Sequence, residues 1–324
     1  MEQIVLDHVV KEYWVTKKKK GLRGALINLI HNEKVKVEAV KGISYTITKG
    51  EIVGYIGPNG AGKSTTIKMM SGIMTPTSGQ IYINGMSPHD NRKKVVKDLG
   101  VVFGQRTQLY WDLRLGESFE LLKRIYKVGD EQYESALKEL TDVLDLAGFI
   151  DIPVRQLSLG QRMRGELAAA MIHSPDILFL DEPTIGLDID AKHAIRNFIL
   201  EINKRKDVTV ILTSHDLDDV MKLCNRLIVI NKGQVVEDGP LEDIVTRMAN
   251  YRMINLELAD PVTEIHSPMV EIVKAEGRKI WCKFDHHLYT AAEVIADIGK
   301  EVSIVDLSVK EPNIEDAVAN IYHC

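Results

Sequence analysis

A glycine-rich loop at residues 57–65 constrains this chain more than any other stretch. It consists of Gly57, Pro58, Asn59, Gly60, Ala61, Gly62, Lys63, Ser64 and Thr65. An apolar run at 52–56 precedes the loop, a helical pattern at 66–70 follows it, and the spacing fits G-x-x-x-x-G-K-[ST]. Strand, glycine loop and helix in this order predict a phosphate site.

The residue types in the loop each have a physical use. Glycines let backbone N–H groups curl around phosphate oxygens without Cβ clashes, and the following helix points its positive end at the same anion. Lys63 supplies a full charge toward the β- and γ-phosphates, and the Ser64 hydroxyl is suited to Mg²⁺. The alternative is a glycine-rich turn with no ligand. Because every required residue is in place, we predict that the loop binds a nucleoside triphosphate.

Composition narrows the remaining possibilities. A chain of 324 residues predicts one large or two modest domains, and a formal net charge of −5 argues against a nucleic-acid partner. The three cysteines, Cys224, Cys282 and Cys324, lack C-x-x-C spacing, so neither a disulfide framework nor a zinc site is indicated. The chain has no signal-peptide pattern and no window near the roughly 18 apolar residues of a membrane span. We expect a cytoplasmic protein whose membrane role depends on a partner.

The hydrophobic pattern changes character near residue 251. Before it, continuous apolar strands alternate with helices, which predicts a parallel sheet covered on both faces. These strands are expected at 4–10, 35–41, 43–47, 52–56, 80–83, 100–103, 176–180, 208–213, 227–230 and 234–237, with helices in 115–149, 157–173 and 191–204. Beyond residue 251 we expect a small α+β unit with strands at 253–258, 269–275, 279–284 and 301–307 and helices at 288–298 and 313–321. His286-His287 has the composition of a metal pair, but a solvated turn is the preferred reading.

Several motifs in a fixed order carry a family resemblance. The loop at 57–65 is followed by Leu157-Ser-Leu-Gly-Gln161, by the apolar run 177–180 with Asp181-Glu182 at its end, and by Gly186-Leu187-Asp188. Over roughly residues 2–240 the chain resembles the nucleotide-binding subunits of ABC transporters, especially the ABC-2 export type. The ending Val309-Lys-Glu-Pro-Asn-Ile-Glu-Asp316 also resembles that type.

The resemblance implies a fold and a domain plan. The fold is a P-loop NTPase of the α/β class, with a RecA-like core, an antiparallel β subdomain and a helical signature subdomain at 115–173. The nucleotide-binding domain is expected at 1–245 and an accessory α+β domain at 251–324, for which we favour a role in holding a dimer together. ATP with Mg²⁺ is the implied nucleotide.

The resemblance also assigns roles at the ends of strands. Asp181 would hold Mg²⁺ together with Ser64, and Glu182 would polarise the attacking water, which needs a carboxylate within hydrogen-bond reach. Gln105 matches the Q-loop, whose amide contacts the metal or the water, and the segment 105–113 would touch the membrane permease. His215 matches the switch histidine that contacts the γ-phosphate.

The signature motif implies a second copy of the chain. Ser158, Leu159, Gly160 and Gln161 would bind the ATP of the opposite subunit in a head-to-tail dimer, formed with itself or with a paralogous ATPase. Asp188 would lie in the D-loop across the same interface. Leu159 departs from the usual glycine, and it would be strained if the position required a positive φ.

Two features near the N-terminus remain open between readings. Tyr13 and Trp14 both qualify as the aromatic that stacks on adenine, and spacing favours Tyr13. The insertion at 17–32 has a basic run, Lys17–Lys20, followed by an amphipathic pattern. It fits contact with anionic lipid and a permease, and it equally fits a helix packed on its own domain.

The leading hypothesis is an ATPase subunit that drives a separate membrane permease for export at the cytoplasmic face of the membrane. The alternatives are a soluble family member that acts on the ribosome or DNA and a switch without appreciable turnover. Soluble translation factors of the family usually carry two nucleotide units in one chain, and repair members carry long coiled coils. This chain has one unit and neither feature, and Glu182 and His215 argue against a switch without turnover.

Overall fold

The computed structural model describes residues 1–16, 34–104, 107–214, 216–248, 251–261 and 265–310. Gln105, His215, the insertion at 17–32 and the helix expected at 313–321 therefore lie outside the described residues. The chain divides into two compact units, Met1–Leu241 and Glu242–Cys324. Among the described helices, none is long and apolar enough to cross a membrane.

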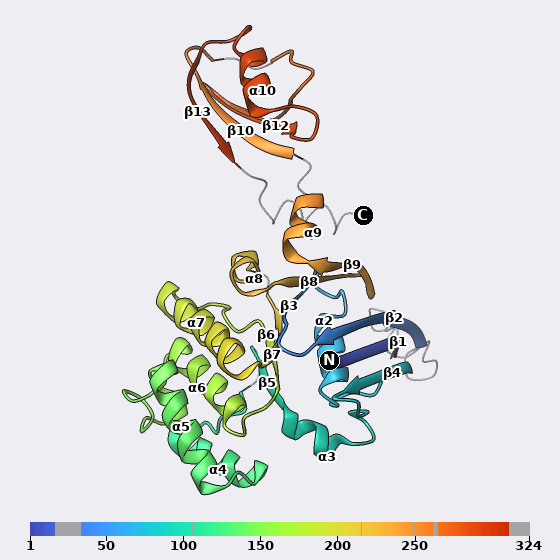
Figure 1. Cartoon of the computed structure of the whole chain (residues 1–324), viewed down its shortest axis with the longest axis vertical. Helices are drawn as coiled ribbons and strands as arrows, with labels where there is room; N and C mark the ends of the chain where they lie inside the picture. Colours follow the sequence, from blue (N-terminus) through green and yellow to red (C-terminus); the bar gives the residue numbers. More distant parts are fainter. Residues whose placement is uncertain (17–33, 105–106, 215, 249–250, 262–264, 311–324) are drawn as a thin grey trace, which may run out of the picture. The chain divides into compact units, whose positions relative to one another are not determined.

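A six-stranded sheet forms the centre of the first unit, in the order β5-β6-β7-β3-β8-β9 (Figure 1). Its strands are β3 (Ile52–Ile56), β5 (Leu99–Phe103), β6 (Ile177–Asp181), β7 (Thr209–Thr213), β8 (Arg226–Asn231) and β9 (Gln234–Pro240). The first five are parallel and β9 pairs antiparallel with β8. Every residue of β3 and β7 is buried, as expected where both faces of a sheet are covered. The predicted parallel sheet is confirmed.

A second, antiparallel sheet has the order β2-β1-β4, with β1 at Glu2–Thr16, β2 at Lys34–Thr48 and β4 at Ser78–Ile83. The prediction of two strands at 35–41 and 43–47 is wrong, because β2 is a single strand. Gly42 has a φ of 76° and is skipped in the pairing with β1, which runs from Val9↔Ile43 to Val10↔Lys41. The glycine therefore makes a β-bulge and not a turn.

Helices cover the central sheet on both sides. The helices of the first unit are α2 (Lys63–Met70), α3 (Arg92–Val95), α4 (Leu115–Tyr126), α5 (Asp130–Leu144), α6 (Leu159–Met171), α7 (Ile189–Lys206) and α8 (Leu217–Leu223), and α9 (Leu241–Met248) begins at the last residue of that unit. In Figure 1, α4 to α7 gather on one side of the central sheet, whereas α2 and the antiparallel sheet lie on the other. One apolar cluster joins α2 and both sheets, with Tyr55, Ile67 and Phe179 fully buried in it.

The second unit is a four-stranded antiparallel sheet with one described helix on it. The order is β11-β12-β10-β13, with β10 at Tyr251–Leu258, β11 at Glu271–Glu276, β12 at Lys279–Asp285, β13 at Ile304–Lys310 and the helix α10 at Ala291–Ile298. Alternate residues of β10 and β12 pack against α10, including Ile254, Leu256, Ile280, Cys282 and Phe284. Within the described residues, no three His, Cys, Asp or Glu side chains gather into a metal-binding group.

A half-buried histidine joins the helical part of the first unit to its central sheet. His173 follows α6, its ring stacks on Tyr126 with centroids 3.9 Å apart, and its Nε2 lies 3.0 Å from the Leu99 carbonyl oxygen. Burial lowers the pKa of His173 to about 4.

This pKa predicts a pH dependence of stability. Between about pH 6.5 and pH 4 the unfolded chain binds a proton at His173 and the folded chain does not, so the free energy of unfolding falls as pH falls through that window. The loss at full protonation is on the order of 3 kcal/mol. Denaturant unfolding at several pH values should show a shallower decline for His173→Gln, which keeps a donor toward Leu99 and does not titrate. An unchanged slope would contradict the prediction.

Candidate nucleotide-binding site

The glycine loop connects β3 to α2 and keeps its backbone accessible. A Cβ on Gly57 would stand 2.1 Å from the Ile230 carbonyl oxygen, so no larger residue fits there. Gly60 and Gly62 have φ values of 80° and 110°, which favour glycine. Gly62 is the N-cap of α2. Because glycine has no side chain, no side-chain hydrogen bond caps the first N–H groups of the helix. Loop and helix end together form a cradle for an anion.

The lysine of the loop is held inside this cradle. The Lys63 side chain is 7% exposed, and its Nζ donates hydrogen bonds to the carbonyl oxygens of Gly57 and, at 3.2 Å, Pro58. Burial lowers the pKa of Lys63, while the negative charges of Glu182 and Asp181 oppose that shift. The Lys63 ammonium group is therefore already positioned inside the loop where a phosphate would bind.

The rest of the loop shapes the cradle. Ala61 is buried, its N–H donates to the Pro58 carbonyl at 3.1 Å, and its carbonyl accepts from Gly233 at 3.0 Å. Asn59 is exposed at the tip of the loop. Thr65 lies in the first turn of α2, directly after Ser64.

An aspartate at the end of β6 meets the loop. The Ser64 hydroxyl lies 3.3 Å from Oδ2 of Asp181, and the Thr213 hydroxyl donates to Oδ1 of the same carboxylate at 2.6 Å. The contact arises because β6 and β7 pair in parallel with Asp181 opposite Thr213. Carboxyl ends of neighbouring parallel strands share one edge of a sheet, and the loop after β3 opens at that edge.

Glu182 follows with an unusual backbone. Its φ is 57°, a left-handed conformation that is uncommon for a residue with a side chain and costs on the order of 1 kcal/mol or more. Its N–H points back to Thr213 and lies 3.0 Å from the carbonyl oxygen and 3.2 Å from the hydroxyl. One pocket is lined by Ser64, Lys68, Ile73, Phe103, Gly104, Asp181 and Glu182. The structure thus brings the predicted metal ligands Ser64 and Asp181 together with the predicted catalytic Glu182.

Tyr13 lies in the strand pair that borders the loop. It pairs with Val37 on β2, two residues from Ala39, whose carbonyl would meet a Cβ on Gly62 at 2.6 Å. The Tyr13 hydroxyl reaches the Met74 sulfur at 2.9 Å, whereas Trp14 is 66% exposed. Stacking of Tyr13 on adenine stays a prediction.

The signature residues form the start of α6. Ser158 is the N-cap: its Oγ accepts from the Gln161 N–H at 3.2 Å, and Gln161 Oε1 accepts from the Ser158 N–H at 2.9 Å. Leu159 is the first helical residue and is absent from the positive-φ residues, so the expected strain at this position does not arise. Its side chain is 41% exposed and lies 3.3 Å from where a Cβ on Gly186 would stand. A Cβ on Gly160 would touch Ala191 at 3.0 Å.

Asp188 is close to this second group. It caps α7, with Oδ1 accepting from the Ala191 N–H at 2.8 Å. The described contacts of residues 158–161 thus include the segment 186–191 of the same chain. Apart from Tyr13, the described site residues consequently fall into two groups: one at the loop and the ends of β6 and β7, and one at the starts of α6 and α7.

Sequence reasoning missed two residues with close contacts here. Thr213 makes hydrogen bonds with both Asp181 and Glu182. The sequence could have pointed to it, because it stands at the end of the predicted strand just before His215. Glu166 in α6 is 5% exposed and accepts from the Thr107 hydroxyl and, at 3.2 Å, from the Gln108 N–H. It fastens part of the segment 105–113 to the signature helix, and nothing in the linear sequence indicated that contact.

The residues fit a nucleoside triphosphate with a divalent cation. The cradle has glycines where side chains would clash, helix N–H groups that no side chain caps and a buried cation, which match a phosphate. The Ser64 hydroxyl and the Asp181 carboxylate are oxygen donors of the kind Mg²⁺ prefers.

Comparison with known proteins agrees with this reading. The ABC transporter family model matches residues 40–185. The chain is 32% identical over 318 residues to methionine import ATP-binding protein MetN 2 of Enterococcus faecalis, covering 92% of this chain and 91% of that one. It is 29% identical to the linearmycin resistance ATP-binding protein LnrL of Bacillus subtilis, covering 87% and 93%. A solved ATP-binding cassette, a dimer in a post-hydrolysis state bound to ADP and Pi, is 28% identical with a TM-score of 0.61, covering 74% of this chain and 98% of that one.

Fold and site define a P-loop ATPase of the ATP-binding cassette class. The chain belongs to the ABC transporter family, as an ATP-binding subunit that hydrolyses ATP.

The cradle geometry predicts the effect of adding one methyl group. Gly57→Ala places a Cβ against the Ile230 carbonyl and should abolish ATP binding, with a loss of stability of about 1–3 kcal/mol from overpacking. Gly148→Ala is the matched control, because a Cβ there meets nothing within 4 Å. Fluorescent-nucleotide titration and thermal unfolding measure both effects. Normal ATP affinity in Gly57→Ala would refute the assignment of the cradle.

Proposed function

We propose that this protein is the motor subunit of a transporter: two copies enclose two ATP molecules and drive a separate membrane permease of the ABC-2 export type. The observation that carries the proposal is the meeting of Ser64, Asp181 and Glu182 beside the glycine loop. In the proposal, residues 1–245 form the cassette and residues 251–324 an accessory domain.

Each residue of the first group has a defined task. The loop N–H groups and Lys63 bind the phosphates and offset the charge that spreads over the transferred group. Ser64 and Asp181, with Gln105, would hold Mg²⁺, which when bound neutralises charge on the phosphate oxygens. Glu182 orients the attacking water and accepts its proton.

The second group supports a dimeric site. Ser158 and the following N–H groups stand at the N-terminus of α6, which is an anion-binding position, yet their described contacts include the segment 186–191. They complete an ATP site if a second copy presents its own loop to them. The solved cassette dimer with ADP and Pi supports this arrangement by analogy.

The membrane partner and the direction of transport rest on resemblance. The exposed Tyr110 and Trp111 in the segment 105–113 supply an apolar surface for a permease. The resemblance favours export, and one relative is named for linearmycin resistance, although another is named for methionine import. The insertion at 17–32, which begins with the basic run, is proposed to touch anionic lipid at the cytoplasmic face of the membrane.

Glu182→Gln tests the motor. The substitution keeps the shape of the side chain and removes the base, so ATP affinity should stay within about twofold while kcat falls by about 100-fold or more. With ATP trapped unhydrolysed, the dimer should accumulate in size-exclusion chromatography with light scattering. Turnover near the wild-type rate would remove Glu182 from its assigned role.

The transport proposal predicts a stable complex with a membrane permease. A permease that co-purifies with this chain should raise its ATPase rate in proteoliposomes, and candidate substrates added on the ATPase side should raise it further if the system exports. Deletion of residues 17–32 should reduce the stimulated rate and leave the rate of the isolated protein unchanged. Equal loss of both rates would refute lipid contact, and failure to recover any membrane protein would refute the transporter assignment.

A further inference from the structure

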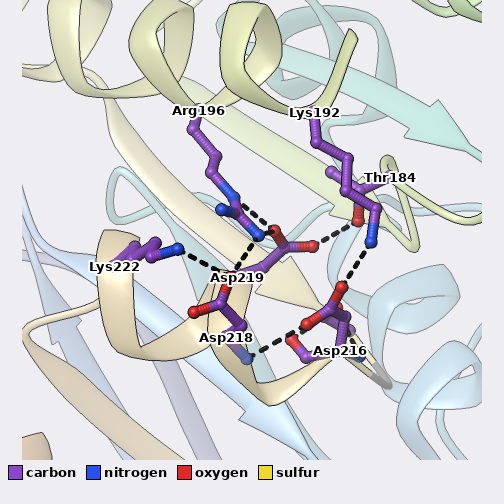
Figure 2. A network of polar contacts seen from close by, with 8 residues as sticks. Thr184, Lys192, Arg196, Asp216, Asp218, Asp219 and Lys222 are labelled. Atoms are coloured by element: carbon purple, nitrogen blue, oxygen red, sulfur yellow. Dashed lines mark hydrogen bonds and ion pairs between the residues drawn. The ribbon is translucent and has the colours of Figure 1, made fainter. Parts of the chain in front are cut away.

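A buried ion-pair cluster lies next to the segment that follows Glu182, and its residues have no role in the proposed function. Its centre is Asp219 in α8, which is fully buried. The Thr184 hydroxyl donates to Oδ2 of Asp219, and Arg196 in α7 donates through Nε to Oδ1 at 2.5 Å. Figure 2 shows the Thr184 and Arg196 side chains converging on the Asp219 carboxylate. Both oxygens of Asp219 are therefore occupied.

The cluster continues to the segment on either side of position 215. Asp216 accepts from Lys192 at 2.5 Å (Figure 2). The Ser214 hydroxyl accepts from the Asp216 N–H at 3.0 Å. Lys192 lies four residues before Arg196 on α7, so the same helix holds both ends of the cluster. The Lys192 contact lowers the pKa of the Asp216 carboxyl, which stays ionised near neutral pH.

The cluster also forms a wall of the catalytic region. A pocket on this side of Glu182 is lined by Glu182, Thr184, Lys192, Ser214 and Asp216. Thr184 is only two residues after Glu182, and Pro183 between them restricts the backbone. Fixing the Thr184 side chain therefore fixes where the chain leaves Glu182.

Glu182 needs such support because its backbone is left-handed. A conformation of this kind persists only where the surroundings determine it from both directions. Before Glu182, the restraint is the pair of contacts from its own N–H to Thr213. After it, the restraints include the Ile185 N–H, which donates to the Glu182 carbonyl at 3.4 Å, and the bond from Thr184 to Asp219, anchored by Arg196.

Fold stability alone is a poor explanation for the cluster. Taking a carboxylate and a guanidinium out of water costs much of what their attraction returns, and apolar residues of the same volume often serve stability as well. A geometric task is a better explanation, because Thr184 and Arg196 engage separate oxygens of one carboxylate.

We propose that Asp219 and Thr184 are positioning residues for Glu182: their hydrogen bond, anchored by Arg196, sets the backbone turn that aims the Glu182 carboxylate. The proposal rests on the proposed role of Glu182 in hydrolysis. It requires no contact between either residue and ATP, so their loss should affect the chemical step and not ATP binding.

The test compares four single variants and one double variant of the full chain. Thr184→Val has the same shape without the hydroxyl, and we expect kcat to fall about tenfold or more while KM for ATP stays within about twofold. Thr184→Ser restores the hydroxyl and should recover at least about half of the wild-type kcat. Thr209→Val is the matched control: Thr209 is also fully buried in a hydrogen bond, but it lies at the opposite end of β7 from Thr213. Its kcat should stay within about twofold of wild type even where its stability falls.

The fourth variant, Asp219→Asn, tests whether the loss of activity comes from the Thr184–Asp219 bond and not from a general loss of stability. Asp219→Asn should lower kcat in the same way, and Thr184→Val combined with it should be no slower than Asp219→Asn alone, because both act through one bond. Unfolding curves are recorded for every variant, and rates are measured below the onset of unfolding.

The outcomes separate this inference from the function on which it rests. A Thr184→Val protein with wild-type kcat overturns the inference, as does a rise in KM equal to the fall in kcat, or a Thr184→Ser protein as slow as Thr184→Val. If Glu182→Gln is inactive while Thr184→Val is normal, only the inference fails. If Glu182→Gln is fully active, the assigned role of Glu182 fails first.

Discussion

The parallel pairing of β6 with β7 is the constraint on which the rest of the site depends. It sets Asp181 opposite Thr213, so one hydroxyl holds the carboxylate beside Ser64 and also receives the N–H of Glu182. Both strands are buried, so this register is determined by core packing and not by the site itself. A phosphate cradle and two carboxylates with different surroundings consequently meet at one edge of the sheet.

The two groups of site residues are the reason for proposing a dimer. The loop group has a cation, the Ser64–Asp181 pair proposed to hold Mg²⁺ and a further carboxylate, while the signature group stands at the start of another helix with contacts to residues 186–191. Leu159 fits the first turn of α6 without strain, so the departure from glycine leaves the helix start intact and adds an apolar side chain near Gly186. The proposed dimer would join the groups, with ATP shared between subunits.

The cluster around Asp219 links several elements beside the site. It joins α7, α8 and the segment after Glu182, and its side chains reach both flanks of position 215. Directional bonds thus tie elements on either side of Glu182 to one buried carboxylate. Glu166 has a similar place in α6, where it fastens Thr107 and Gln108 to the signature helix. In both cases an acid is buried and fully bonded, which favours one geometry over its alternatives.

The sequence by itself determined the phosphate loop, the parallel sheet and the acidic strand end, because each is a local pattern: glycine spacing, apolar runs and two consecutive acids. It did not show that 35–47 is one strand, since a glycine reads as a turn until its partner strand makes it a bulge. Whether Leu159 would be strained was likewise decided only by its helical backbone. The structure alone revealed Thr213, Glu166 and the Thr184–Asp219–Arg196 contacts, which join residues up to 59 positions apart. Such contacts depend on which helices and strands pack together, and that is a property of the tertiary fold.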